Sequence, residues 1–267
     1  MTLRVCLAGA TGWAGSALAR EIAEVDDVTL AAAVSRTHAG RVLGEVLDEP
    51  RLTCRVYATA EAALAAELCN VFVEYTKPDS AREHVLAALA HGAHVVVGTS
   101  GLTEEDFAQI AAAAEETGRG VLACGNFALT VVLLQRFAEM AAQYVEQWEI
   151  IDYAGAGKVD APSGTARELA HRLSQVRRPE MTVPLDEVAG PVETRGATLD
   201  GSQVHSVRLP GYTISLDVIF GLPDQKLVLR HEAGSSAQPY VAGALLAIRE
   251  VSGLVGLHRG LDTVMAL

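Results

Sequence analysis

The stretch LRVCLAGATGWAG, residues 3–15, decides the fold class, because it joins a short apolar run to a loop with three glycines. The apolar run is typical of a strand in a parallel sheet, and residues 14–25 show helical spacing. Between a strand and a helix, glycines allow a tight turn and let the backbone approach a pyrophosphate. A turn without a ligand is the alternative. At this place in the chain, however, the pattern predicts a dinucleotide site formed by Gly9, Ala10, Thr11, Gly12, Trp13 and Ala14.

Strand-like and helical segments alternate through the first 126 residues. Further apolar runs lie at 28–34, 71–75, 93–98 and 120–125, separated by helical stretches at 59–68, 80–92 and 103–118. This alternation predicts an α/β domain over residues 1–126 with a doubly wound parallel sheet of the Rossmann type. Thr103 precedes three acidic residues and is predicted to cap the helix that follows it.

The pattern changes near residue 127. Helical stretches at 129–145 and 163–176 are combined with strand-like runs at 148–154, 202–211, 212–221 and 226–233. These runs predict a second α+β domain over residues 127–236 with an open antiparallel or mixed sheet. Residues 177–200 are rich in Pro, Gly and Thr and are predicted to form a loop. A helical segment then opens residues 237–267, which we expect to join the first domain.

Composition excludes several classes of protein. The 267 residues include 21 Lys and Arg and 33 Asp and Glu, which gives a net charge of −12. Such a chain repels nucleic acid and anionic lipid, so neither is an expected partner. No apolar run approaches the roughly 20 residues of a membrane span, and no signal-peptide pattern opens the chain, so we expect a cytoplasmic protein. The four cysteines form no CxxC pair and no other metal-binding motif occurs, so we expect neither disulfides nor a metal.

The residues after the second predicted strand bear on the choice of cofactor. An NAD site usually has Asp or Glu here, where it binds the ribose hydroxyls, whereas this chain has Ser35 and Arg36. A guanidinium pairs with a 2′-phosphate that a carboxylate would repel. The sequence therefore favours NADPH, with NADH as a possible second cofactor. The alternative is that Arg36 is a solvated surface arginine.

The string KVDAPSGTA, residues 158–166, is the most specific in the chain. It places two hydroxyls and backbone N–H groups at the start of a predicted helix, close to a lysine. These groups suit a carboxylate, although an ordinary capped helix would have a similar pattern. We therefore expect a substrate anchor formed by Lys158, Ser163, Gly164 and Thr165.

This string resembles the KxDAPSGTA motif of the 4-hydroxy-tetrahydrodipicolinate reductase (dihydrodipicolinate reductase) family, which acts in the lysine pathway. Residues 8–15, 204–211 and 229–232 are similar to further motifs of that family. The resemblance implies a Rossmann domain, a domain for substrate binding and oligomerisation, and a homotetramer. It also implies cofactor contacts near the nicotinamide and the domain junction, carried here by Gly98, Thr99, Ser100, Gly125, Asn126, Phe127 and Ala128.

The chain departs from the family in its substrate half. The family pattern E-x-H-H-x-H-K is replaced by DYAGAGK at 152–158, so all three histidines are missing. The resemblance assigns the first histidine as acid/base and the second to substrate binding, and Ala154 and Gly155 can do neither. A family segment like LVAHQEV is also replaced, by YTISLDV at 212–218.

An imine can be protonated from solvent before hydride arrives, so an imine reductase can function without a dedicated acid. The loss of one acid/base residue typically lowers the reaction rate by about 10²–10⁴-fold. Candidate proton donors are Lys158, Tyr153 and Tyr212, with Lys158 first because it can also pair with a carboxylate. Tyr153 has a core-packing role as its alternative. The sequence thus favours an NADPH-dependent reductase of a different carboxylate-bearing imine. Two alternatives are the lysine-pathway reaction without histidines and a nucleotide-binding homologue without turnover.

Overall fold

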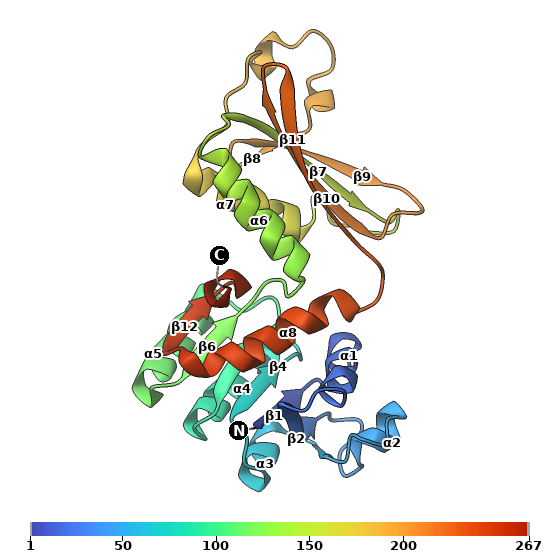
Figure 1. Cartoon of the computed structure of the whole chain (residues 1–267), viewed down its shortest axis with the longest axis vertical. Helices are drawn as coiled ribbons and strands as arrows, with labels where there is room; N and C mark the ends of the chain where they lie inside the picture. Colours follow the sequence, from blue (N-terminus) through green and yellow to red (C-terminus); the bar gives the residue numbers. More distant parts are fainter. Residues whose placement is uncertain (1, 266–267) are drawn as a thin grey trace. The chain divides into compact units, whose positions relative to one another are not determined.

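The computed structural model describes residues 2–265, and the chain divides into two compact units (Figure 1). The first comprises Met1–Leu129 together with Ala237–Leu267, and the second is Thr130–Ser236. Each unit has its own sheet and its own core.

The first unit contains a seven-stranded sheet in which every pair of neighbours is parallel. Its order is β12-β6-β5-β4-β1-β2-β3. The strands are β1 (Leu3–Ala8), β2 (Val28–Val34), β3 (Arg55–Tyr57), β4 (Val71–Glu74), β5 (His94–Val97), β6 (Gly120–Ala123) and β12 (Gly256–Arg259). The strand order reverses between β1 and β4, and in such sheets ligands bind beyond the carboxyl ends of the strands at this point.

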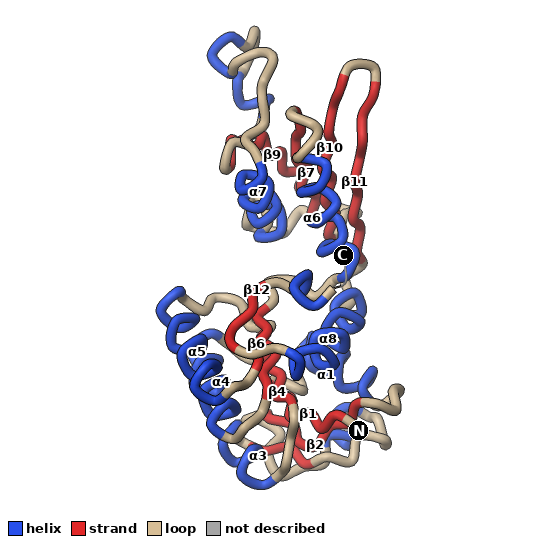
Figure 2. The backbone as a smooth tube through the Cα atoms, turned by 60° about the vertical axis from the view of Figure 1, so that its left-hand side comes forward, coloured by secondary structure: helices blue, strands red, loops and turns tan. Residues whose placement is uncertain are grey.

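Helices cover both faces of this sheet, as the predicted doubly wound class requires (Figure 2). One face carries α3 (Ala60–Ala66), α4 (Pro78–Ala90) and α5 (Glu104–Thr117), and the other carries α1 (Trp13–Ile22) and α8 (Gln238–Glu250). The short α2 (Leu43–Leu47) and the 3₁₀ turns η3 (Val251–Gly253) and η4 (Leu261–Val264) complete the unit. Thr103 caps α5 as predicted, and Asp106 returns the bond in a capping box.

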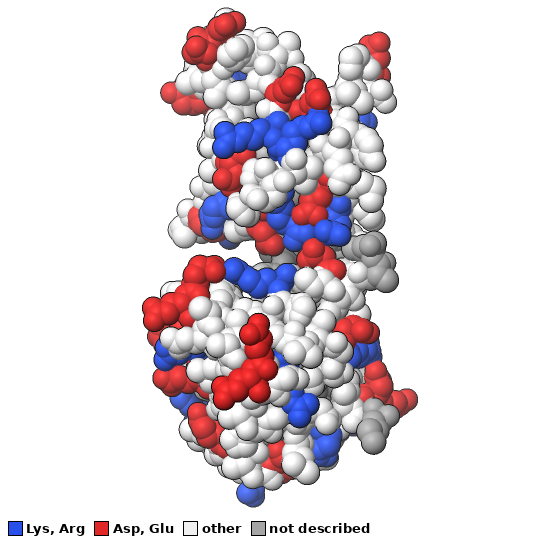
Figure 3. All heavy atoms as spheres, turned by 90° about the vertical axis from the view of Figure 1, so that its left-hand side faces the viewer, with Lys and Arg blue, Asp and Glu red and all other residues white. Residues whose placement is uncertain are grey.

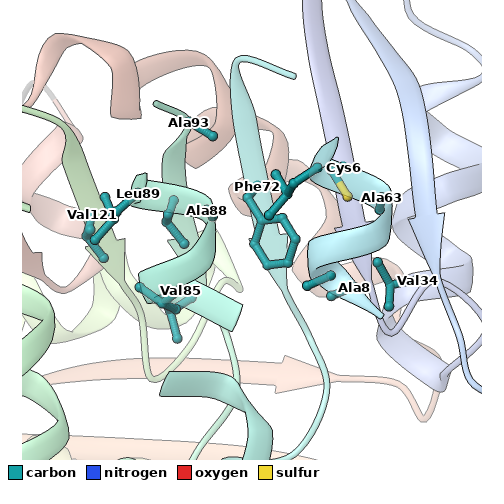
Figure 4. Packing of buried hydrophobic residues seen from close by; sticks show 14 of the residues in the cluster. Cys6, Ala8, Val34, Ala63, Phe72, Val85, Ala88, Leu89, Ala93 and Val121 are labelled. Atoms are coloured by element: carbon teal, nitrogen blue, oxygen red, sulfur yellow. The ribbon is translucent and has the colours of Figure 1, made fainter. Parts of the chain in front are cut away.

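The core on the α3–α5 face centres on Phe72 of β4, which is fully buried. In Figure 4 its ring lies between Val85 and Ala88 of α4 on one side and Cys6 and Ala63 on the other. Small side chains dominate this cluster, so the helices approach the sheet closely.

The second unit has a five-stranded sheet of order β11-β10-β7-β9-β8. Its elements are α6 (Leu129–Ala142), β7 (Gln147–Ala154), α7 (Gly164–Val176), β8 (Ala197–Leu199), β9 (Ser202–Arg208), β10 (Ile214–Leu222) and β11 (Gln225–Ala233). The sheet is mixed, because β7 and β9 pair in parallel while the other neighbours are antiparallel. A parallel pair needs a crossover, and α7 lies in the connection between these two strands.

The two faces of this second sheet differ. Along β7, Trp148, Ile150, Asp152 and Ala154 are buried and alternate with more exposed residues. The buried face packs on α6 and α7 through a cluster that includes Leu134, Leu169 and Phe220. The alternation of WEIIDYA therefore reflects a sheet that helices cover on one face only.

Several elements were not predicted from sequence. β3, α2, β8 and β12 are each five residues or shorter. Residues 177–200, predicted as a loop, contain β8 and the 3₁₀ turns η1 (Leu185–Glu187) and η2 (Val192–Arg195). The missed elements lack the continuous apolar run that marks the equally short strands β4, β5 and β6 in the sequence.

Acidic and basic side chains are interspersed on the face shown in Figure 3. Many form ion pairs, such as Arg51 with Glu24 and Arg249 with Asp27. Within residues 2–265, no helix is long and apolar enough to cross a membrane. The same residues contain no cluster of three His, Cys, Asp or Glu side chains that could hold a metal.

Candidate active site

The glycine loop after β1 is shaped by contacts that leave no room for side chains. Gly9 has a φ of +80°, and a Cβ there would lie 2.2 Å from the Tyr75 carbonyl oxygen. A Cβ on Gly15 would lie 2.1 Å from the Gly9 carbonyl oxygen. The Gly12 amide donates to that same oxygen at 2.9 Å, and α1 begins directly afterwards. The loop thus brings bare backbone to a helix N-terminus, an arrangement that fits a pyrophosphate.

A cleft of about 740 Å³ lies along this loop and the end of β2. The predicted residues Gly9, Thr11, Gly12, Ser35 and Arg36 all line it. The hydroxyls of Thr11 and Ser35 share a hydrogen bond of 2.9 Å, which ties the loop to the end of β2. Arg36 is exposed and has no ion pair among the described residues. Its guanidinium is therefore available to a phosphate in the cleft.

A second cavity, of about 310 Å³, brings together most of the other predicted cofactor residues. Its lining includes Trp13, Ala14, Gly98, Thr99, Ser100, Gly125, Asn126 and Phe127. Tyr75 also lines it, and its ring centroid lies 5.8 Å from that of Phe127. Burial raises the pKa of the Tyr75 phenol, and its hydroxyl has no hydrogen-bond partner within the described part of the chain. The cavity thus combines aromatic walls with an unused polar atom, as a site for a planar amide-bearing ring would.

Two predicted residues lie behind the walls of these cavities. Ala10 and Ala128 are both buried and line neither cavity. The Ala128 amide donates to the Asn126 side chain at 2.8 Å. Ala128 therefore contacts a residue of the cavity lining without lining the cavity itself.

Glu74 and His84 were missed from the sequence. Glu74 ends β4 with no exposed surface, and His84 Nδ1 donates to its carboxylate at 2.8 Å. This hydrogen bond raises the pKa of His84, against the opposing effect of burial. An acidic residue at the end of the apolar run VFVE was the available signal. His84 lies within the helical stretch at 80–92, and the sequence pattern alone does not pair the two residues.

In the second unit, the predicted anchor lies at the start of α7. Ser163 is the N-cap, and its hydroxyl accepts from the Ala166 amide at 3.3 Å. Its own amide donates to Asp152 at 2.8 Å and is therefore already used. The amides of Gly164 and Thr165 are first-turn groups, which have no partner within a helix. These two amides and the hydroxyl protons remain as donors for an anion.

The loop before the anchor is held by Arg208, another residue that was not predicted. Its guanidinium donates to the Asp152 carboxylate at 2.7 Å and to the Asp160 carbonyl at 2.8 Å. Lys158, the first-choice proton donor, pairs with the Asp160 carboxylate at 2.7 Å. This contact lowers the pKa of Asp160. A substrate carboxylate at Lys158 would thus share the ammonium group with Asp160.

Tyr153 points to the other face of the sheet. It lies opposite Ser215 in the register, whereas Asp152 lies opposite Leu216 on the face that carries α7. The Tyr153 hydroxyl donates to Asp217 at 3.2 Å, and the Tyr153 ring stacks on Tyr212 with centroids 5.1 Å apart. Burial and the charge of Asp217 raise its pKa. The structure therefore does not bring Tyr153 and Tyr212 together with the Ser163 anchor.

Comparison with protein families gives matches along nearly the whole chain. The model described as dihydrodipicolinate reductase, N-terminus, matches residues 3–127. The model described as dihydrodipicolinate reductase, C-terminus, matches residues 130–263.

Individual relatives agree with these matches. The 4-hydroxy-tetrahydrodipicolinate reductase of Halalkalibacterium halodurans is 35% identical over 263 residues, which cover 98% of this chain and 99% of that protein. The enzyme of the same name from Desulfitobacterium hafniense is 36% identical and covers 98% of each chain.

Among solved structures, dipicolinate-bound dihydrodipicolinate reductase from Paenisporosarcina sp. TG-14 has a TM-score of 0.88 and 30% identity, with coverage of 99% of this chain and 100% of that one. An amine dehydrogenase from Mycobacterium smegmatis has a TM-score of 0.68 at 15% identity, which indicates a shared fold alone.

A glycine loop at a strand-order reversal, adjoining cavities and a separate mixed-sheet unit together define an oxidoreductase of the Rossmann class. Within that class, the chain belongs to the dihydrodipicolinate reductase family, as its motifs predicted. This family uses a nicotinamide cofactor.

The Glu74–His84 contact predicts a pH-dependent contribution to stability. The pKa of His84 is raised above its ordinary value of 6.5, so the folded state gains most below pH 6.5 and loses this gain as pH rises through the raised pKa. We expect His84→Asn to lower the free energy of unfolding by about 1–2 kcal/mol below pH 6 and by less above pH 8. Urea denaturation of both proteins at several pH values measures the difference. A difference that stays constant with pH would contradict the prediction.

Proposed function

We propose that the chain is an NADPH-dependent reductase of an imine that carries a carboxylate, with a substrate other than that of the lysine-pathway enzymes. One observation carries this proposal: Ala154 and Gly155 occupy the histidine positions of the family pattern, while the carboxylate anchor at Ser163 is kept. In this proposal, residues 1–126 with 237–267 bind the cofactor, and residues 127–236 bind the substrate and form the oligomer.

The structure has little room for side chains larger than those of Ala154 and Gly155, which occupy two of the family's histidine positions. Ala154 is 1% exposed, so a larger side chain there would displace the atoms that pack around it. A Cβ on Gly155 would lie 3.2 Å from the Tyr212 carbonyl oxygen, which is tight. Positions 154 and 155 therefore supply neither a cation nor an acid where the family pattern has imidazoles, and this supports a substrate with one anchored carboxylate.

The roles of the residues follow from what each can donate. A bound NADPH supplies the hydride. The glycine loop would hold the pyrophosphate, Ser35 and Arg36 the 2′-phosphate, and residues 98–100 and 125–127 the wall of the nicotinamide cavity. The amides of Gly164 and Thr165 would hold the substrate carboxylate. Lys158 would complete this anchor and donate a proton to the imine nitrogen.

The lysine-pathway reaction itself is the second candidate. The relatives named for it match this chain from end to end, and an imine protonated by solvent would not need the histidines. A nucleotide-binding homologue without turnover is the remaining alternative.

The role of Lys158 can be tested with three variants. Lys158→Ala should lower imine-dependent NADPH oxidation at least about tenfold, because a charge-assisted contact and the proton donor are both removed. Tyr153→Phe should have less than about a threefold effect, since its hydroxyl faces Asp217 on the opposite side of the sheet. Lys226→Ala, an exposed lysine of β11, is the charge-matched control. The measurement is NADPH absorbance against a panel of cyclic imines and 2-oxo acid/amine mixtures.

The same panel should include the dihydrodipicolinate precursor. Turnover of that precursor at the rate of histidine-containing family members would favour the second candidate. Absence of turnover on every imine, with no effect of Lys158→Ala on carboxylate binding, would leave the non-catalytic alternative.

Cofactor preference is a further prediction. NADPH should bind more tightly than NADH by about 1–3 kcal/mol, because the 2′-phosphate pairs with Arg36. Arg36→Ala should abolish most of this difference, whereas Arg41→Ala, an exposed neighbour paired with Glu45, should keep it. Calorimetric titration of both cofactors decides the matter, and equal affinities in the unmodified protein would refute the assignment.

We also propose a homotetramer. The face of the second sheet away from α6 and α7 carries Ile151, Ile219 and the exposed Val228. A hollow of about 560 Å³ on this face is lined partly by Met181 and Val183. Burying these apolar side chains between copies would stabilise an assembly. Light scattering should give the mass of four chains at micromolar concentration, and a species of 28.1 kDa would count against it.

A further inference from the structure

Glu74 is a buried carboxylate with four donors around it. One oxygen accepts from the Thr76 amide at 2.7 Å, from the Thr76 hydroxyl, and from the Thr99 hydroxyl at 3.2 Å. The other accepts from His84 at 2.8 Å. Both oxygens of the carboxylate therefore have hydrogen-bond donors, three on one oxygen and His84 on the other.

The position of this group relates it to the cofactor cavity. Thr76 and Thr99 both line the 310 Å³ cavity, so the carboxylate lies one hydrogen bond behind the cavity wall. Because Glu74 has no exposed surface, solvent screens its charge poorly on that side, and a buried charge acts over several ångströms.

His84 controls how much of this charge is compensated. It is the only partner of Glu74 among the residues described that can itself become a cation. The groups that face His84 are Glu74 from β4, Glu61 from α3 and its neighbour Glu83 on α4. All three are acidic, so a protonated His84 neutralises Glu74, and a neutral one leaves its charge in place.

We propose that Glu74 is a specificity-determining residue that makes the cavity prefer the oxidised, cationic nicotinamide over the reduced, neutral one, and that His84 sets the strength of this preference. The inference rests on the proposed nicotinamide position. A negative charge there stabilises the positive charge that develops on the ring as hydride leaves, which is electrostatic assistance to the reaction. Glu74 acts through space and through Thr76 and Thr99, without touching the reacting atoms.

The test compares the dissociation constants of NADP⁺ and NADPH by calorimetry, a ratio in which the shared adenine and phosphate contacts cancel. Glu74→Gln can keep an oxygen toward Thr76 and Thr99 and an amide toward His84, so it removes the charge with little change of shape. We expect this variant to weaken the binding of NADP⁺ relative to that of NADPH by about tenfold. Glu116→Gln removes an exposed acidic charge at the C-terminal end of α5 and should change the ratio less than about twofold.

The pH dependence gives a second readout. In the unmodified protein the preference for NADP⁺ should grow as pH rises and His84 loses its proton. His84→Asn keeps a donor but no titrating charge, so its ratio should be independent of pH and equal to the high-pH value of the unmodified protein. This variant decides the matter even if Glu74→Gln does not fold.

The outcomes separate the two proposals. If the protein binds neither nucleotide, the proposed function fails. If it binds both with a ratio that Glu74→Gln leaves unchanged, or that Glu116→Gln changes equally, only the role of Glu74 is overturned. A ratio that does not vary with pH in the unmodified protein overturns the role of His84.

Discussion

The direct contact between the glycine loop and the end of β4 is the constraint on which the first unit depends. At Gly9 the backbone passes so close to the Tyr75 carbonyl that no Cβ fits. This contact fixes where β1 ends and where α1 starts, and it places the residues after β4 beside the loop. Tyr75 and Thr76 therefore line both cavities beside the loop because glycine allows two strand ends to meet.

Much of the first unit could be predicted because the local sequence pattern of most of its segments agrees with the secondary structure that they adopt. β1 and β2 have the predicted bounds, since each is an apolar run between polar or glycine residues. β12 could not be predicted, because four residues that include His258 and Arg259 show no period, and their place beside β6 depends on tertiary contacts. The burial of Glu74 could not be predicted either, because it depends on His84 and Thr99, which come from other elements.

The second unit shows where a motif does not determine geometry. The string at 158–166 correctly located a capped helix, but the Ser163 amide is used by Asp152, eleven residues earlier. The alternation in β7 indicated two faces without indicating which one carries α7, so the sequence could not show that Tyr153 and Ser163 lie on opposite faces of the sheet. Arg208 adds to the first of these contacts, because it ties β9 to Asp152 and to the loop before Ser163. These contacts hold the start of α7 and the loop before it in place.

The first unit is formed by two separate stretches of the chain, and this affects the order in which the units can fold during synthesis. The chain leaves this unit after Leu129 and returns at Ala237, and Gly256 pairs with Gly120 near the end of synthesis. Until the last residues leave the ribosome, β6 is a bare sheet edge and the face that α8 covers is open. Such edges and apolar faces recruit other chains. The intervening second unit, whose residues are contiguous, can fold first, so the nascent protein carries a finished second unit while the first is still incomplete.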